Sequence, residues 1–139
     1  MQQRNLVLIL ARDLADKLAS AMFVVDDEGT LFYFNEAAAE ILGKTFGEFG
    51  MMREEEWSQA FGPMESDGRT FRPEELPLVV ARREQRPSHR TFRITNMEGE
   101  VRSVAVTALP LFARKDEFVG AAAVFWEHAP PEAAEGEGR

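Results

Sequence analysis

Side chains that commonly carry catalysis are few in this sequence, and their spacing does not form a familiar active site. His89 begins an expected strand and His128 begins a polar tail, so we interpret both as solvated. Glu54, Glu55 and Glu56 could suggest a metal site or an acid–base pair. Consecutive residues of one helix point in different directions, however, which favours a solvated helix face. No serine lies in a nucleophile elbow and no glycine-rich phosphate loop is present, so we expect no catalytic residue and no metal site.

The composition excludes several further kinds of site. The chain has 139 residues and no cysteine, which rules out disulfides, thiolate metal sites, a cysteine nucleophile and a cysteinyl-linked chromophore. A net charge of −8 argues against wrapping nucleic acid or an anionic membrane. No apolar run approaches the roughly 20 residues that span a bilayer, and the apolar start is too short for a signal peptide. We therefore expect a cytoplasmic protein with neither a nucleic-acid nor a membrane partner.

One basic run stands out in this acidic chain. Arg82, Arg83, Arg86 and Arg90 follow one another closely. Such a cluster could dock an acidic partner or ligand through charge-assisted hydrogen bonds. The alternative is a charged helix end followed by a loop, because cations are favoured near a helix C-terminus. We favour the alternative.

Hydrophobic periodicity and turn residues predict an ordered set of elements. Asn35 is placed to cap a helix, Gly43 to end it, and Pro110 should mark a strand edge or a bulge. Between residues 44 and 72 we expect short helices and loops. Helices are expected at the start of the chain, at 36–42 and at 73–83, and strands at 22–26, 30–34, 88–96, 101–112 and 118–127. The strands at both ends of the chain should form one antiparallel sheet with helices on one face, an α+β fold.

Both faces of this sheet are expected to be apolar. In the last strand Ala123 and Phe125 point to one face, and Val124 and Trp126 to the other. An antiparallel sheet more commonly leaves one face to water, so each face here needs a cover. Helices cover one face, and the leading amphipathic helix, completed by a second copy of the chain, covers the other. The predicted dimer interface comprises Val7, Leu10, Leu14, Leu18, Ala122, Val124 and Trp126.

This order of elements, with these residues, resembles the PAS domain family of sensory modules. The resemblance covers roughly residues 20–127, beginning with the stretch "FVVDDEGTLFYFNEAAAEILG". The matching positions are Asp26, Gly29, Asn35, Ala37, Ala38 and Gly43 in the first half, and Gly99, Pro110 and Gly120 in the second. The family's photosensory branch uses a reactive cysteine and its haem branch a helical histidine. Neither is found in the corresponding helix here, so haem and a cysteinyl-linked flavin are not expected.

The resemblance implies a five-stranded antiparallel sheet in the order 2-1-5-4-3. It divides the chain into an N-terminal dimerisation helix at 1–21, a PAS domain at 22–128 and a disordered acidic tail at 129–139. It also implies a pocket between sheet and helices, for a flavin or another apolar small molecule, unless this space is an ordinary filled core. The pocket residues that we predict are Asn35, Ile41, Phe49, Trp57, Phe61, Val79, Val80, Phe92, Ile94, Val104 and Val106.

The function that follows is a non-enzymatic sensory or regulatory module in signal transduction. It would bind a small ligand or a protein partner, form a homodimer and act on a separate signalling effector. One alternative is a ligand-free dimerisation or adaptor domain. Another is a small cone-shaped α+β enzyme, which would need a buried acid or histidine with a shifted pKa in its cavity.

Overall fold

The computed structural model describes residues 3–65, 67–114 and 116–128 of the chain. Its centre is one antiparallel sheet of five strands in the order β2-β1-β5-β4-β3, as predicted. The strands β1 and β5, from opposite ends of the chain, pair directly with each other at the middle of the sheet. The strand bounds are Ala21–Asp26 (β1), Leu31–Phe34 (β2), Ser88–Thr95 (β3), Val101–Arg114 (β4) and Glu117–Glu127 (β5).

The pairing of β4 explains the position of Pro110. The strand β3 pairs with β4 only as far as Ala108, so beyond that residue β4 has a single partner strand, β5. Pro110 lies there, opposite Ala121 of β5. A proline has no N–H to donate, and on the side of β4 away from β5 no strand is present here to accept one. The prediction of an edge or a bulge at Pro110 is confirmed, and a register shift follows between Leu111 and Phe112.

Four helices and a short 3₁₀ turn lie on one face of the sheet. They are α2 (Glu36–Leu42), α3 (Phe46–Phe49), α4 (Glu54–Ala60), η1 (Pro73–Glu75) and α5 (Pro77–Glu84). On this face Phe23, Phe92 and Phe125 of the strands pack in one hydrophobic core together with Trp57 of α4 and Leu78 of α5. This face therefore holds the main core and is the place to look for a pocket.

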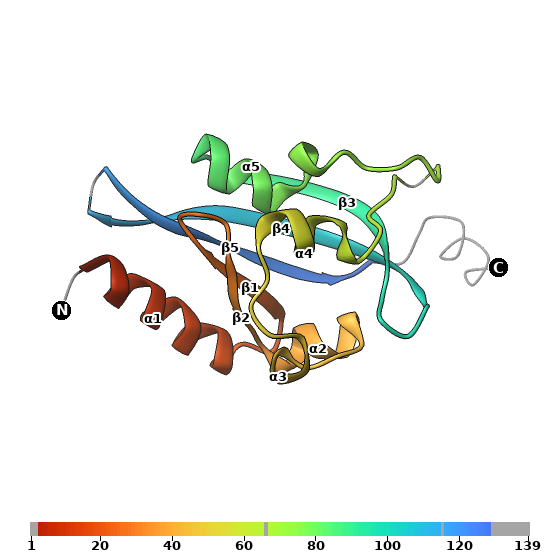
Figure 1. Ribbon diagram of the computed structural model, residues 1–139, viewed down its shortest axis with the longest axis horizontal. Helices are drawn as coiled ribbons and strands as arrows, with labels where there is room; N and C mark the ends of the chain where they lie inside the picture. The colour runs from red at the N-terminus through yellow and green to blue at the C-terminus, as the bar shows by residue number, and fades with distance from the viewer. Residues whose placement is uncertain (1–2, 66, 115, 129–139) are drawn as a thin grey trace.

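The leading helix α1 (Gln3–Lys17) covers the other face. In Figure 1 the sheet passes between α1 and α5. Ala11 and Ala15 of α1 join Met22, Val24 and Ala122 of the central strands in a second, smaller cluster. Both faces of the sheet are therefore covered within a single chain, at least over β1 and the adjoining part of β5.

The side of α1 that lies closest to the sheet carries small residues. Leu10 and Leu14 are 56% and 53% exposed, whereas Ala11 and Ala15 are buried. Small side chains let the helix backbone approach the sheet closely, and this closeness is needed for the Asn35 Nδ2 to donate to the Ala15 carbonyl at 2.8 Å. Leu10 and Leu14 consequently face away from the sheet, while Leu8 packs against the second cluster.

Local signals set the helix ends, with one exception to the prediction. Asn35 is the N-cap of α2, accepting a hydrogen bond from Ala38 N, and Gly43 ends that helix in the left-handed conformation, as expected. The single helix predicted at 73–83 is wrong, because Leu76 is extended, with ψ 136°, between η1 and α5. Pro77 causes this break, since the residue before a proline is pushed out of the helical region.

The structure bears differently on the predicted tail and on the predicted lack of a membrane span. The acidic tail at 129–139 lies outside the described residues. Within the part of the chain that the structure describes, no helix combines the length and the apolar character needed to cross a bilayer.

Candidate functional site

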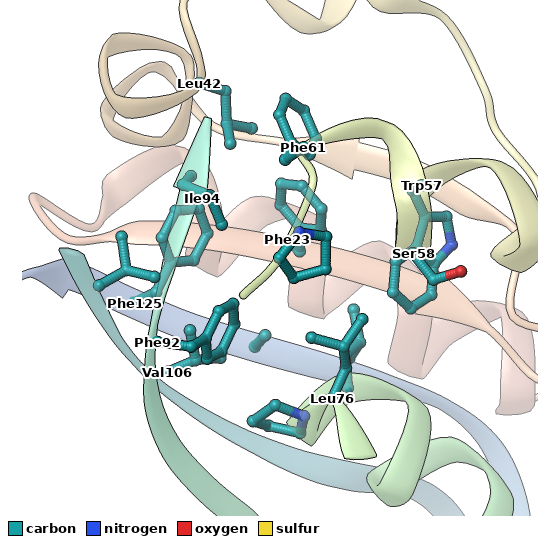
Figure 2. A pocket seen from close by; sticks show the side chains of 15 residues that line it. Phe23, Leu42, Trp57, Ser58, Phe61, Leu76, Phe92, Ile94, Val106 and Phe125 are labelled. Carbon is teal, nitrogen blue, oxygen red and sulfur yellow. The ribbon is translucent and has the colours of Figure 1, made fainter. Parts of the chain in front are cut away.

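A small apolar cavity lies between the inner face of the sheet and the helices. Its volume is about 90 Å³. Figure 2 shows Phe23, Phe92, Val106 and Phe125 reaching it from the strands, with Trp57 and Ser58 opposite on α4. The full lining is Phe23, Leu42, Trp57, Ser58, Phe61, Pro63, Leu76, Pro77, Leu78, Phe92, Ile94, Val104, Val106, Ala123 and Phe125.

The lining determines what chemistry the cavity can accept. No charged or titratable side chain faces it. The indole N–H of Trp57 is already used, since it donates to the Gly29 carbonyl at 2.8 Å. The Ser58 hydroxyl is the remaining side-chain polar group of the wall. A charged ligand would lose its hydration here without replacement, so the cavity suits an uncharged apolar molecule.

The volume sets the size of that molecule. An engineered cavity of about 150 Å³ in another protein stays dry and binds benzene or xenon. Sites for drug-sized ligands occupy about 300–1,000 Å³. At about 90 Å³ this cavity is smaller than that engineered one, so a molecule of about the size of benzene is the largest that we expect it to accept without rearrangement. A flavin would require the surrounding helices to move apart.

Six of the predicted pocket residues line the cavity and five do not. The six are Trp57, Phe61, Phe92, Ile94, Val104 and Val106. Ile41, Phe49 and Val79 lie in or against the main core, and Val79 also lines a different, polar cleft. Val80 is buried outside that core. Asn35 lies at the joint of α1, β1 and α2, where its amide makes four hydrogen bonds. Ile41, Val79 and Val80 do not line the cavity because the short helices α2 and α5 aim only part of one face at it.

Sequence reasoning missed most of the lining outside β3, β4 and α4. Phe23, Ala123 and Phe125 could have been found, because strand alternation places them on the same face as Val106. Leu76, Pro77 and Leu78 could not, because their direction depends on the break at Leu76. The remaining missed residues are Leu42, Ser58 and Pro63.

Beside the cavity, a buried carboxylate joins two arginines. The Glu54 side chain is 7% exposed. Arg82 Nε and Nη2 donate to it at 2.7 and 2.9 Å, and Arg83 Nη2 and Nε at 2.8 and 3.1 Å. Burial raises the pKa of Glu54, but the hydrogen bonds from both arginines outweigh burial and hold the pKa below its usual value. We call these three side chains the clasp, because they join α4 to α5.

The clasp lies under the turn between β1 and β2. A Cβ atom at Gly29 would come within 2.8 Å of Arg82 Nε and 2.9 Å of Glu54 Oε1, so only glycine fits. Next to the clasp is a polar cleft of about 300 Å³. It is lined by Glu28, Glu54, Glu55, Ser58, Gln59, Pro73, Val79, Arg82 and Arg83.

The arginine run is paired with carboxylates of the same chain. Besides the two arginines of the clasp, Arg86 pairs with Glu84, and Arg90 with Glu65. Arg90 also lies over the Phe71 ring at 4.6 Å. These pairs favour a structural role for the run over an acidic partner.

The remaining chemical candidates do not converge on a site. His89 is exposed, with its Nδ1 2.6 Å from the Thr107 hydroxyl and its ring near Trp126. Glu56 accepts a hydrogen bond from Arg53 N at the start of α4, and Glu55 is exposed. Among the described residues no group of three His, Cys, Asp or Glu side chains could hold a metal ion.

The predicted dimer residues occupy different surroundings. Leu10 and Leu14 are exposed on α1, beside the exposed Leu6 and Ile9, and Trp126 is 44% exposed at the end of β5. Val7 and Val124 are half-buried, and Leu18 packs against the second cluster. Ala122 is corrected: it is 1% exposed beneath α1, so it cannot contact another chain in this conformation.

The sheet order, with helices and an apolar cavity on one face, defines the PAS class of α+β domains. The sequence model of the PAS domain family matches residues 19–127, and the chain belongs to this family. PAS domains are sensory signalling modules and are generally non-enzymatic. Comparison with curated proteins gives no match.

Solved structures share the fold at low identity. The Rhodobacter sphaeroides LOV protein has a TM-score of 0.67 and 16% identity, covering 99% of this chain and 74% of that chain. The PAS domain of Bordetella pertussis BvgS has a TM-score of 0.57 and 19% identity, covering 94% and 92%. The LOV domain of the Erythrobacter litoralis EL346 blue-light activated histidine kinase has a TM-score of 0.62 and 18% identity, covering 82% and 100%. At these identities the likeness shows the fold alone.

Proposed function

We propose that this chain is a sensory module that binds a small, uncharged apolar molecule in the cavity between sheet and helices. The observation that carries the proposal is the lining, which is built of aromatic, aliphatic and proline side chains and bears no charge. Occupancy would shift how the helices sit on the sheet, and so bias a two-state equilibrium. A separate effector would read this shift.

The same lining argues against an enzyme. General acid–base and nucleophilic catalysis need a titratable or nucleophilic group near the reacting atoms. Ser58 is the nearest candidate, and no histidine or carboxylate faces the cavity with it. We therefore propose a binding role without catalysis.

The ligand proposal is tested by titrating the protein with benzene and following the chemical shifts of the lining methyl groups by NMR. We expect saturable shifts at Val104, Val106 and Leu78. Ala123→Leu is the matched variant, because its three additional carbon atoms fill the cavity from β5. Shifts that vanish in Ala123→Leu support the site, whereas no binding to the wild type, or equal binding to both, overturns it. Native mass spectrometry of protein from its own host would identify a retained molecule.

We further propose that the exposed side of α1 forms a homodimer interface. Leu6, Ile9, Leu10 and Leu14 expose between 44% and 56% of their surface on one helix, and an apolar stripe of this kind is unusual on a monomer. In Leu14→Glu we expect a carboxylate in the contact to convert the dimer to monomers in native mass spectrometry. Met51→Glu is the control, because Met51 is 66% exposed and lies off α1. A monomeric wild type, or an intact Leu14→Glu dimer, would contradict the proposal.

The small cavity favours one alternative, a ligand-free dimerisation or adaptor domain. If the cavity is simply a packing defect of about 90 Å³, the domain would act by its α1 surface alone. Benzene binding separates the two functions, since the adaptor needs no ligand but still needs the dimer.

A further inference from the structure

The helix α4 has the features of a movable wall of the cavity. It has seven residues, Glu54–Ala60, and a helix of this length is not stable alone. Gly50 and Gly62 flank it with φ of 78° and 53°, and a Cβ atom at either glycine would meet nothing within 4 Å. These two positions are therefore uncrowded, and glycine tolerates a wider range of backbone angles than any other residue.

Backbone hydrogen bonds fix the chain on either side of α4, since Leu31 N donates to the Met52 carbonyl and Thr95 N to the Phe61 carbonyl, both at 2.7 Å. Three sets of side-chain contacts hold the helix itself. Trp57 and Phe61 are buried in the main core. The Trp57 indole donates to the Gly29 carbonyl. The third set is the clasp, in which Glu54 at the first turn of α4 binds Arg82 and Arg83 at the last turn of α5. The clasp is the polar link between these two helices.

The clasp is one helical turn away from the cavity wall. Residues four apart on a helix lie on the same side, one above the other. On α4 this places Glu54 next to Ser58, and on α5 it places Arg82 next to Leu78. Ser58 and Leu78 line the apolar cavity, and Ser58 also lines the polar cleft that holds the clasp. The contact between α4 and α5 therefore separates the cavity from a cleft that water can enter.

We propose that α4 is the gate through which a ligand reaches the apolar cavity, and that the clasp holds this gate closed. The proposal rests on the proposed function, because it names the route to that same cavity. Outward movement of α4 about Gly50 and Gly62 releases the backbone hydrogen bonds of Met52 and Phe61, joins the cavity to the polar cleft and enlarges it. This movement also explains how a cavity of about 90 Å³ can admit a larger molecule.

The chemistry of the clasp suits a gate that opens rarely and closes again. Opening breaks up to four charge-assisted hydrogen bonds, but all three charged groups gain water as they separate. Arg83 is already 51% exposed, so it remains hydrated in both states. A contact between apolar side chains would instead expose apolar surface to water on opening, and no hydration of charged groups would offset that cost.

The test compares Glu54→Gln with Glu55→Gln. Both variants remove one carboxylate from the same helix and the same cleft, but only the first weakens the clasp. Benzene is the probe, and NMR exchange gives its association and dissociation rates. In Glu54→Gln we expect both rates to rise by about tenfold while the dissociation constant changes by less than about threefold. In Glu55→Gln we expect the rates of the wild type. Equal rates in all three proteins overturn the gate and leave the binding function standing.

A measurement without ligand separates the two proposals. Amide hydrogen exchange should show faster local opening of Trp57 and Ser58 in Glu54→Gln, with the central amides of β5 unchanged. If benzene binds no variant, the ligand function is overturned and the ligand route with it, and faster exchange in α4 then shows only that the clasp holds α4. If α4 exchange is the same in Glu54→Gln and the wild type, the clasp does not hold α4, and the gate is overturned whatever benzene does.

Discussion

Asn35→Ala is the most informative single change to the fold, because one buried amide joins three elements. Its Oδ1 accepts from Met22 N and Ala38 N, both at 3.0 Å, at the start of β1 and of α2. Its Nδ2 donates to the carbonyls of Ala15 and Ser20, at 2.8 and 2.9 Å. The last carbonyls of a helix have no partner within it, so Asn35 caps the end of α1 as well as the start of α2.

The expected loss of stability follows from these four bonds. Loss of the α2 cap costs about 1 kcal/mol. The buried Met22 N–H loses its partner, which costs about 1–3 kcal/mol more. Water can reach the Ser20 carbonyl, since Ser20 is exposed, so the carbonyls add less. We expect a total of about 3 kcal/mol, which leaves most domains of marginal stability folded.

Urea unfolding and amide exchange together test this reasoning. We expect α1 amides in Asn35→Ala to exchange under conditions where β5 amides remain protected. Asn96→Ala is the matched control: its buried amide bonds Ile41, Glu98 and Glu100, and it contacts nothing in α1. It should cost a similar free energy without freeing α1. A loss below about 1 kcal/mol in Asn35→Ala, or equal α1 protection in both variants, would refute the role of Asn35 as a joint.

Three further changes test other parts of the structure. Phe92→Ala should cost about 3–5 kcal/mol in urea unfolding and enlarge the cavity, and a loss near zero would mean that Phe92 is not part of a close-packed core. Burial, and then the hydrogen bond to Asp16, raise the pKa of the Tyr33 phenol from 10.0 to about 12. The folded protein therefore keeps this proton longer than the unfolded chain does, so the stability that it contributes below pH 10 is lost between pH 10 and 12. The chain has one tyrosine, so the absorbance of its tyrosinate should appear only well above pH 10. Tyr33→Phe should abolish that part of the pH dependence of stability. A tyrosinate transition near pH 10 would contradict the contact between Tyr33 and Asp16. Gly120→Ala would place a Cβ atom 2.3 Å from the Val25 carbonyl oxygen, so its melting temperature should fall by several degrees, and an unchanged melting temperature would show that β1 can move away from β5.

Most of the fold could be predicted from the sequence, because its signals are local. Alternation of apolar residues, the turn at Gly29 and the cap at Asn35 each act within a few residues, and the structure has the strands and α2 where these signals place them. The PAS resemblance then supplied the sheet order, which no local signal contains. The break before Pro77 was also predictable in principle, because a proline restricts the residue before it. The prediction of one continuous helix at 73–83 overlooks this restriction.

The candidate site was predictable only in part. Strand residues such as Phe92 and Val106 were placed correctly in the cavity because alternation fixes the face of a strand. Residues on α2 and α5 were not, because a small rotation of either helix decides whether a side chain meets the cavity or the core. The clasp escaped prediction because Glu54 and Arg82 are 28 positions apart, and neither local sequence indicates the other.

By itself the sequence determined the order of elements, the apolar character of both sheet faces and the absence of any cysteine chemistry. Tertiary structure alone decided which side of α1 meets the sheet, which carboxylate binds the arginines, and how much space remains in the core. The physical reason is the separation along the chain over which each interaction acts. Turns, caps and alternation depend on neighbours along the chain, whereas close approach, ion pairing and cavity volume depend on how distant segments come together in space.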